Sequence, residues 1–206
     1  MNALVATVVA YLLGSIPFAY LAGRAKGIDL RTVGSGNLGA ANVFRALGKG
    51  MGISVMALDI GKGVVAVLLA RLITDDPWPA VAAGAAMAGH VFPVWLRFKG
   101  GKGVAVGGGA VIGLMPLAAV LLLALWAVVL VTTRYSSLAS IVAAAAATPV
   151  VWAMGYPTSR VVFVAIGCAG VLVLHRSNMR RLLAGTENRI AFSRRPAADA
   201  EPGSPA

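Results

Sequence analysis

Long apolar runs separated by short polar clusters constrain this chain more than any other feature of its sequence. The apolar segments lie at about 3–22, 51–72, 79–95, 104–114, 116–133, 137–154 and 158–174. A helix of about 20 apolar residues crosses the hydrocarbon core of a bilayer, and irregular backbone is excluded from lipid. We therefore predict an all-α integral membrane protein with seven transmembrane helices. The polar clusters between them lie at 34–45, 99–103, 134–140 and 175–181.

The composition supports this class and narrows what the chain can bind. Of its 206 residues, 59% are hydrophobic and 12% are charged, whereas a soluble domain holds about 25% charged residues. The single cysteine, Cys168, excludes an intramolecular disulfide and a cysteine metal site. The net charge of +11 gathers at the ends of the apolar segments, so we expect membrane lipid and no nucleic acid as a partner. We expect neither a metal nor a cofactor.

Both ends of the chain carry signals. The stretch 3–21 is long enough to span and no basic residue precedes it, so we predict a retained helix and not a cleaved signal peptide. The last residues, 196–206, are rich in proline and glycine and hold no large apolar side chain. We predict one seven-helix membrane domain over 1–192 and a disordered cytoplasmic tail over 193–206.

The fourth apolar segment differs from the others. The stretch 104–114 is too short for a full crossing, contains four glycines and stops before Pro116. We predict a short or irregular helix, which a membrane tolerates where protein or water covers its free backbone groups. The alternative is that the fourth and fifth segments form one long bent helix.

The distribution of basic residues favours seven separate elements. With seven crossings and the N-terminus outside, the outer loops carry only Arg71 and Arg160, and Lys62 lies within a span. Every other lysine and arginine then lies on the inner side, as the positive-inside rule requires. A single helix over the fourth and fifth segments would split the polar clusters across the membrane. We therefore expect all four clusters and the C-terminus to face the cytoplasm.

The first cluster reads GSGNLGAANVFR over 34–45. Its three glycines let the backbone adopt positive φ and direct successive N–H groups at an anion. Arg45 can give a phosphate two parallel hydrogen bonds, and Ser35 can donate its hydroxyl. A flexible connector is the alternative, but a connector needs no Asn42 and Arg45 at a helical spacing of three. We assign phosphate binding to Ser35, Gly36, Asn37, Gly39, Asn42 and Arg45.

The second cluster, FKGGKG over 98–103, leads directly into the short fourth segment. The N-terminus of a helix offers unpaired N–H donors and a favourable field to an anion, and Lys102 is expected in its opening turn. Glycine follows the lysine, so the pattern is not a Walker A loop and nucleotide binding is not supported. The alternative is an ordinary basic turn. We assign substrate binding to Gly101, Lys102 and Gly103.

The third and fourth clusters each hold a polar pair at a spacing of three, which places both side chains on one helical face. Ser137 and Ser140 begin the sixth span and can support a helix contact or donate to a substrate. His175 and Asn178 lie where the last span reaches the cytoplasm, among arginines that suit anionic lipid. The arginines explain lipid attraction but not the histidine and asparagine.

Three ionisable residues lie within the spans. Asp59 and Lys62 are three apart in the second span, and buried charges in a bilayer normally pair, so we predict an internal ion pair. Direct contact of Lys62 with a ligand is the second interpretation. His90, near the inner end of the third span, is predicted to be a structural hydrogen-bond partner, with catalysis as the alternative.

Several motifs together resemble one family. They are GSIPFAYLAGR, GSGNLGAANVFR, LDIGKG, GHVFPVWLRFKGGKGVA, RYSSLASI and HRSNMRRLLAGTEN, in this order over about residues 5–192. The chain resembles the bacterial membrane glycerol-3-phosphate acyltransferases that use acyl phosphate as donor, the PlsY family. The resemblance implies transfer of an acyl chain from acyl phosphate to the 1-hydroxyl of glycerol 3-phosphate, in the bacterial inner membrane. The products implied are lysophosphatidic acid and phosphate.

The resemblance also implies roles for individual residues. It assigns substrate contacts to Ser35, Arg45, Lys102, Ser140, His175 and Asn178. Among these, His175 and Asn178 are implied to lie nearest the reacting hydroxyl, as the catalytic pair. The family often has threonine after Ala40, where this chain has Ala41, so a hydroxyl contact to phosphate there is absent or made by backbone.

The residue inventory agrees with transfer from an activated donor. An acyl phosphate needs no protein nucleophile, and the sequence holds no G-x-S-x-G elbow. Catalysis would then come from holding two anionic substrates together and from donors that face the developing oxyanion. The H-x-x-x-x-D motif of acyl-CoA acyltransferases is missing after His90 and His175. A transporter of organic phosphates is the main alternative, and a non-catalytic lipid-binding scaffold is the third.

Overall fold

The structure, a computed structural model, describes residues 1–190 as helices and connecting loops. The predicted tail at 193–206 lies outside the described residues. The helices are α1 (Asn2–Ser15), α2 (Phe18–Ala25), α3 (Ala40–Leu47), α4 (Lys49–Ile73), α5 (Trp78–Val91), the 3-10 turn η1 (Val94–Leu96), α6 (Val104–Leu114), α7 (Pro116–Thr133), α8 (Ser136–Ala153), α9 (Thr158–Leu174) and α10 (Arg176–Leu183).

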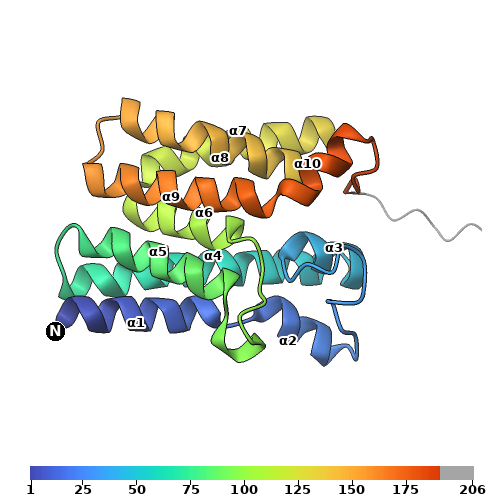
Figure 1. Cartoon of the computed structure of the whole chain (residues 1–206), viewed down its shortest axis with the longest axis horizontal. Helices are drawn as coiled ribbons and strands as arrows, with labels where there is room; N and C mark the ends of the chain where they lie inside the picture. Colours follow the sequence, from blue (N-terminus) through green and yellow to red (C-terminus); the bar gives the residue numbers. More distant parts are fainter. Residues whose placement is uncertain (191–206) are drawn as a thin grey trace, which may run out of the picture.

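The long helices form two layers with α6 between them (Figure 1). One layer holds α1, α4 and α5, and the other holds α7, α8 and α9. The short helix α6 packs on α4 and α5 in the first layer and on α7 and α9 in the second. Helix α6 therefore joins the two halves of the bundle.

Small residues set the close packing of α4 against α6. A Cβ atom at Gly63 would overlap the carbonyl oxygen of Val106, and one at Gly109 would overlap the carbonyl oxygen of Ile60. Lipid gives helices no hydrophobic reason to associate, so close backbone approach over small residues supplies the packing energy. The glycines of the fourth apolar segment thus serve contact with α4, which the sequence alone did not indicate.

The helices confirm an all-helical membrane protein but not all seven predicted crossings. Five of them are long and apolar enough to span a bilayer when α1 is counted together with α2, and α5 with η1. A sixth crossing results if α9 and α10, bent by 54° at their junction, form one span. Helix α6 has 11 residues and falls short of a span by length.

The predicted break between the fourth and fifth segments is present, because α6 ends at Leu114 and α7 begins at Pro116. Two arginines from neighbouring helices cover carbonyl groups that this break exposes. Arg71 Nη1 donates to Gly113 O at 3.0 Å, and Arg160 Nη1 donates to Leu114 O at 2.9 Å. Protein therefore satisfies the end of the short helix, as its place in a membrane protein requires.

The predicted first span is interrupted. The chain leaves the helix at Ile16 and Pro17 and resumes it as α2. Proline lacks a backbone N–H and clashes with the preceding turn, which explains why the helix stops there. The loop that follows is more ordered than a connector, because residues 40–47 form the amphipathic helix α3.

Candidate active site

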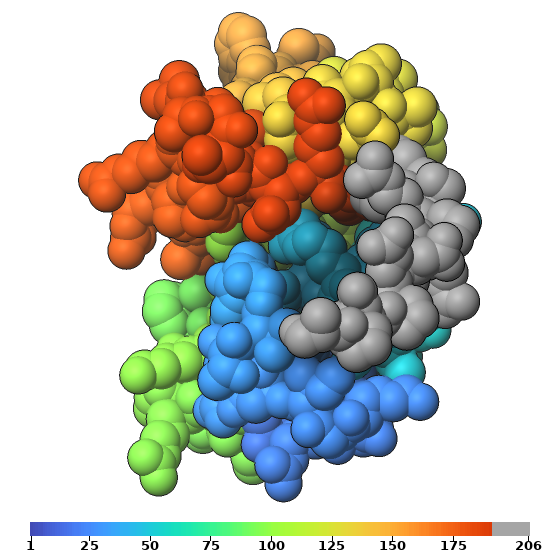
Figure 2. All heavy atoms as spheres, turned by 90° about the vertical axis from the view of Figure 1, so that its right-hand side faces the viewer, coloured from blue at the N-terminus to red at the C-terminus, as the bar shows by residue number. Residues whose placement is uncertain are grey.

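One end of the bundle gathers residues from all four polar clusters around a cavity of about 590 Å³. Figure 2 looks onto this end, where the surface is hollowed between the segment around α3 in blue and the segment around α10 in red. Most of the predicted site residues line the cavity: Ser35, Asn37, Gly39, Asn42, Arg45, Lys102, Gly103, Ser140, His175 and Asn178. Of the predicted set, Gly36 and Gly101 lie outside this lining.

The loop of the first cluster is held by a buried asparagine. Asn42 Oδ1 accepts from the backbone N–H of Ser35 at 3.0 Å, and its Nδ2 donates to Leu30 O and Val33 O, both at 3.1 Å. Its amide is therefore fully used inside the protein, so Asn42 shapes the loop. Gly36, with φ at 67°, has the left-handed backbone predicted for this cluster, whereas Gly39 is extended.

Arg45 presents free hydrogen-bonding capacity to the cavity. Its Nη2 lies 3.4 Å from Ser35 Oγ, and its buried Nε has no hydrogen-bond partner among residues 1–190. Burial lowers the pKa of the guanidinium from its ordinary value, with nearby Glu187 opposing this change and Arg181 adding to it. Buried N–H groups are nearly always paired, so Arg45 Nε is free to donate to an acceptor that enters the cavity.

Lys102 projects from the loop before α6. It precedes Gly103, the N-cap of α6 with φ at 79°, so it lies just outside the helix and not in its opening turn. Its ammonium donates to Asn178 Oδ1. Burial, together with the charges of Arg181 and Arg45 and against that of Glu187, lowers the pKa of Lys102 to about 8.

His175 and Asn178 both line the cavity from the junction of α9 and α10. His175 Nδ1 lies 2.8 Å from Val171 O, and because a carbonyl only accepts, this nitrogen carries a proton. In the neutral ring, Nε2 therefore keeps its lone pair. Asn178 Nδ2 donates to Glu187 Oε1 at 2.6 Å. The asparagine thus bridges Lys102 and Glu187.

Glu187 is a cavity residue that the sequence reasoning missed. Its carboxylate accepts from Ser137 Oγ and Arg181 Nε, both at 2.7 Å, in addition to Asn178. Burial raises the pKa of Glu187, but the three hydrogen bonds outweigh it and hold the pKa below its usual value. The sequence signal that could have indicated Glu187 is that it is the single acidic residue in HRSNMRRLLAGTEN.

The two serines of the third cluster have different partners. Ser137 holds Glu187, as described above. Ser140 lines the cavity, where its hydroxyl donates to Ser136 O at 2.8 Å and accepts from Trp126 Nε1 at 3.3 Å. Ser140 therefore ties α8 to α7 at the point where the polar end of the cavity meets its apolar part.

Beyond this point the cavity continues as an apolar groove between the two layers. Its far end is lined by Ala119, Ala147 and Phe163. From His175 to Phe163 along α9 the distance is about 18 Å at 1.5 Å per residue. The cavity thus joins a cationic end to a long apolar groove, which suits an amphiphilic ligand with an anionic head.

The predicted ion pair in the second span is confirmed. Lys62 Nζ lies 2.8 Å from Asp59 Oδ1 in the buried face of α4. Lys62 does not line the large cavity, so its direct contact with a ligand is not supported. His90 has the structural partner predicted for it, because its Nδ1 lies 3.1 Å from Lys62 Nζ.

Comparison with known proteins gives one consistent family. The family model described as glycerol-3-phosphate acyltransferase matches residues 4–185. Two curated relatives carry this name. The one from Geobacter sulfurreducens is 47% identical over 191 residues, covering 92% of this chain and 98% of the relative. The one from Rubrobacter xylanophilus is 48% identical over 181 residues, covering 87% and 91%.

Two solved structures share the fold. The glycerol 3-phosphate form of PlsY, an integral membrane glycerol 3-phosphate acyltransferase, is similar with a TM-score of 0.90 and 40% identity. Its lysophosphatidic acid form has a TM-score of 0.86 and 39% identity. Each comparison covers 93% of this chain and 96% of the other.

Proposed function

The chain belongs to the glycerol-3-phosphate acyltransferase family, and from this premise we propose that its cavity transfers a fatty acyl chain from acyl phosphate to the 1-hydroxyl of glycerol 3-phosphate. The products are lysophosphatidic acid and phosphate. The observation that carries the proposal is the continuity of a cationic end and an apolar groove within one cavity. Membership of an enzyme family removes the transporter and the lipid scaffold as alternatives.

The cationic end binds the phosphate groups of the two substrates. Arg45 supplies an N–H that has no partner within residues 1–190, and Lys102 supplies an ammonium whose present partner is a neutral amide oxygen. A phosphate oxygen is a stronger partner for both groups, since charge-assisted hydrogen bonds are about twice as strong as neutral ones. The backbone of the Ser35 and Gly103 loops adds N–H donors at the same end.

The groove holds the acyl chain. Its walls come from α6, α7, α8 and α9 and carry almost only apolar side chains, among them Leu122 and Val164. Burial of each methylene contributes about 0.8 kcal/mol. A chain in the groove brings its activated carboxyl carbon to the level of Ser140 and His175.

Transfer is direct and needs no acyl-enzyme. The hydroxyl oxygen of glycerol 3-phosphate bonds to the acyl carbon, the bond from that carbon to the phosphate oxygen breaks, and phosphate leaves with the electron pair. The hydroxyl proton passes to a phosphate oxygen or to His175 Nε2. Cys168 also lines the groove, but it lies seven residues before His175, about 10 Å along α9.

His175 and Asn178 orient the hydroxyl by accepting its hydrogen bond, and they stabilise the positive charge that develops on its oxygen during attack. Support comes from His175 Nε2, which keeps a lone pair, and from the position of both residues on the cavity wall. When a phosphate replaces Asn178 Oδ1 as the partner of Lys102, the amide oxygen becomes available to the glycerol hydroxyl. Both residues then act on the reacting atoms, where preorganised polar groups have their largest effect.

We assign seven crossings to the chain in the bacterial inner membrane, with α6 as the short fourth crossing and residues 1–192 as one domain. The N-terminus lies outside, and the active site and C-terminus lie in the cytoplasm. Support comes from the basic residues, since Arg71 ends α4 and Arg160 begins α9 at the end of the bundle opposite the cavity mouth. The remaining basic loops then follow the positive-inside rule.

Release of phosphate from palmitoyl phosphate tests the activity. The purified protein in detergent micelles should release phosphate only when glycerol 3-phosphate is present, and lysophosphatidic acid should form in equal amount. Initial rates should show sequential kinetics, with both substrates bound before transfer. A ping-pong pattern, or acylated protein trapped without glycerol 3-phosphate, would replace direct transfer by a covalent route.

A further inference from the structure

A buried charged cluster lies outside the set of residues that contact substrate in the proposed mechanism. Asp59 and Lys62 of α4 and His90 of α5 are 1%, 5% and 9% exposed. His90 Nδ1 lies 3.1 Å from Lys62 Nζ and 3.6 Å from Asp59 Oδ1, which also lies 2.8 Å from Lys62 Nζ. Asp59 Oδ1 is within ion-pair distance, but its geometry is outside that of a hydrogen bond. We call these three residues the triad.

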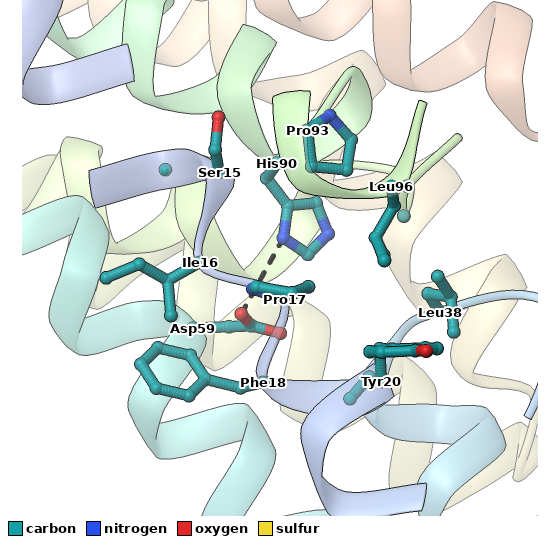
Figure 3. A pocket seen from close by; sticks show the side chains of 14 residues that line it. Ser15, Ile16, Pro17, Phe18, Tyr20, Leu38, Asp59, His90, Pro93 and Leu96 are labelled. Carbon is teal, nitrogen blue, oxygen red and sulfur yellow. Dashed lines mark ion pairs between the residues drawn. The ribbon is translucent and has the colours of Figure 1, made fainter. Parts of the chain in front are cut away.

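Two members of the triad, Asp59 and His90, lie between two cavities. Asp59 and His90 line the substrate cavity, and they also line a small cavity beside the break between α1 and α2. Figure 3 shows the His90 ring and the Asp59 carboxylate facing one another next to Ile16 and Pro17. The triad is therefore adjacent to the reacting end of the substrate cavity.

His90 supports the turn that precedes Lys102. Its carbonyl oxygen accepts from the N–H of Gly101 at 3.1 Å, and the carbonyl of Val91 accepts from Gly100 at 3.0 Å. A Cβ atom at Gly101 would overlap His90 Nε2, so the imidazole packs directly on this backbone. The backbone of this segment and the imidazole ring of His90 thus both contact the turn before Lys102.

The triad also contacts the segment that leads to the other phosphate-binding loop. Lys62 Nζ donates to Ile16 O at 2.8 Å, within the break before α2. Leu38, which belongs to the first cluster, lines the small cavity, and a Cβ atom at Gly101 would lie 2.9 Å from the carbonyl oxygen of Leu38. The Ser35–Arg45 loop and the Gly100–Gly103 loop therefore meet over the triad.

Stability alone is a weak reason for such a cluster. Desolvation of two charges is costly, and apolar replacements of a buried ion pair are often neutral or stabilising. Ionisable residues within membrane spans accordingly mark functional positions by default. A charged group with directional partners does fix geometry, which an apolar core of the same volume does less well.

We propose that Asp59, Lys62 and His90 are positioning residues for acyl transfer, which hold the Gly100–Gly101 turn so that Lys102 faces Arg45 across the phosphate site. The inference rests on the proposed role of Lys102. The triad touches no substrate atom in this arrangement. It acts through the backbone that connects His90 to Lys102.

Three variants test the triad in micelles: His90→Gln, Lys62→Met and the double variant Asp59→Leu with Lys62→Met. The double variant removes both charges together, so no unpaired buried charge remains to unfold the protein. Each folded variant should lose at least tenfold in kcat/KM for glycerol 3-phosphate. Ser54→Ala, at an exposed position of the same helix α4, is the matched control and should keep full activity.

The pH profile separates positioning from simple loss of structure. The groups that face Lys102 are Arg45 of α3, Asn178 and Arg181 of α10, and Glu187, with His175 nearby. If the turn loosens, Lys102 becomes more solvated, and the alkaline limb of kcat/KM should move to higher pH in all three variants. An unchanged limb in folded but slow variants contradicts the inference.

A double-mutant cycle with Lys102→Ala completes the test. If the triad acts through Lys102, His90→Gln should cost less than twofold in the Lys102→Ala background. Independent, multiplicative losses contradict the inference and leave the proposed active site intact. Near-normal activity of Lys102→Ala alone contradicts the proposed site itself. Full activity of the double variant with an inactive His90→Gln contradicts the triad, because His90 would then act alone.

Discussion

At the scale of single residues, the charge of Lys102 links the structure to a measurable pH dependence. The ammonium is the form that binds phosphate, and the pKa of Lys102 lies at about 8. The charge is therefore present below this pKa and is lost as the pH rises through it. Burial has lowered the pKa of Lys102 to about 8, a pH at which an ordinary lysine, with a pKa of about 10.4, stays fully charged.

We predict that kcat/KM for glycerol 3-phosphate falls as the pH rises through about 8, because the free enzyme then loses the Lys102 charge. The profile is measured from initial rates of phosphate release in wide-range buffers. Lys102→Arg keeps its charge throughout this range and should lack the limb. Persistence of the same limb in Lys102→Arg would assign it to another group.

Arg45→Ala should lower kcat/KM by two or more orders of magnitude. A hydrogen bond to a charged group contributes about 1.5–3 kcal/mol, and more when it acts mainly in the transition state. Arg45→Lys should recover only part of the loss, because the planar fork is missing. The control is Arg24→Ala at the exposed end of α2. An active Arg45→Ala at substrate concentrations below KM would remove this residue from the site.

At the scale of elements, the short helix α6 depends on side chains from other helices. Arg71 from α4 and Arg160 from α9 donate to its last carbonyl groups. Arg160 also lies 3.4 Å from Asp76 and over the ring of Tyr156. The C-terminal end of α6 is thus anchored to both layers.

Arg160→Met should lower the thermal unfolding temperature while it leaves the phosphate end of the cavity intact. Leaving a buried carbonyl without its donor costs about 1–3 kcal/mol. Differential scanning fluorimetry of the purified protein in detergent measures the shift. Arg24→Met, an exposed arginine at the other end of the bundle, should cause a much smaller shift. Equal shifts in the two variants would mean that the contact with α6 contributes nothing.

The sequence predicted those elements whose signal is local. Apolar length placed the segments, and the glycines before Val104 placed the start of α6. The interruption at Ile16 was missed although Pro17 was a local signal for it, because the apolar run continues through the break. The Lys62 ammonium, which donates to Ile16 O there, comes from another helix. The predicted site residues Lys102 and His175 both line the cavity, because each lies in a polar cluster that stands out in the sequence alone.

Glu187 was missed because its importance comes from three partners on two helices, and the internal use of Asn42 follows from a loop geometry that spacing does not reveal. The roles of the site residues in catalysis stay predictions. The contacts between one polar cluster and another could not be predicted from sequence patterns.

At the scale of the whole molecule, thiol labelling tests the orientation in the membrane. We predict that single cysteines introduced at Ser35, Lys102 and Asn178 in a Cys168→Ala background resist an impermeant thiol reagent in intact cells. All three positions line the mouth that we assign to the cytoplasm. The same variants should react in lysed cells, and a cysteine at Asp75, between α4 and α5, should react in intact ones. Ready labelling of the cysteine at position 102 from outside would contradict the predicted topology.

Side chains at the border of the groove have one further consequence. Ile53, Ile112 and Leu123 line the cavity and are also exposed on the surface of the bundle, at 45%, 38% and 56%. We infer that the groove opens sideways, toward the lipid. A newly made product can leave without passing through water, with its phosphate already at the surface and its tail already among neighbouring lipids. Release through this opening would place the new lipid in the monolayer in its final orientation.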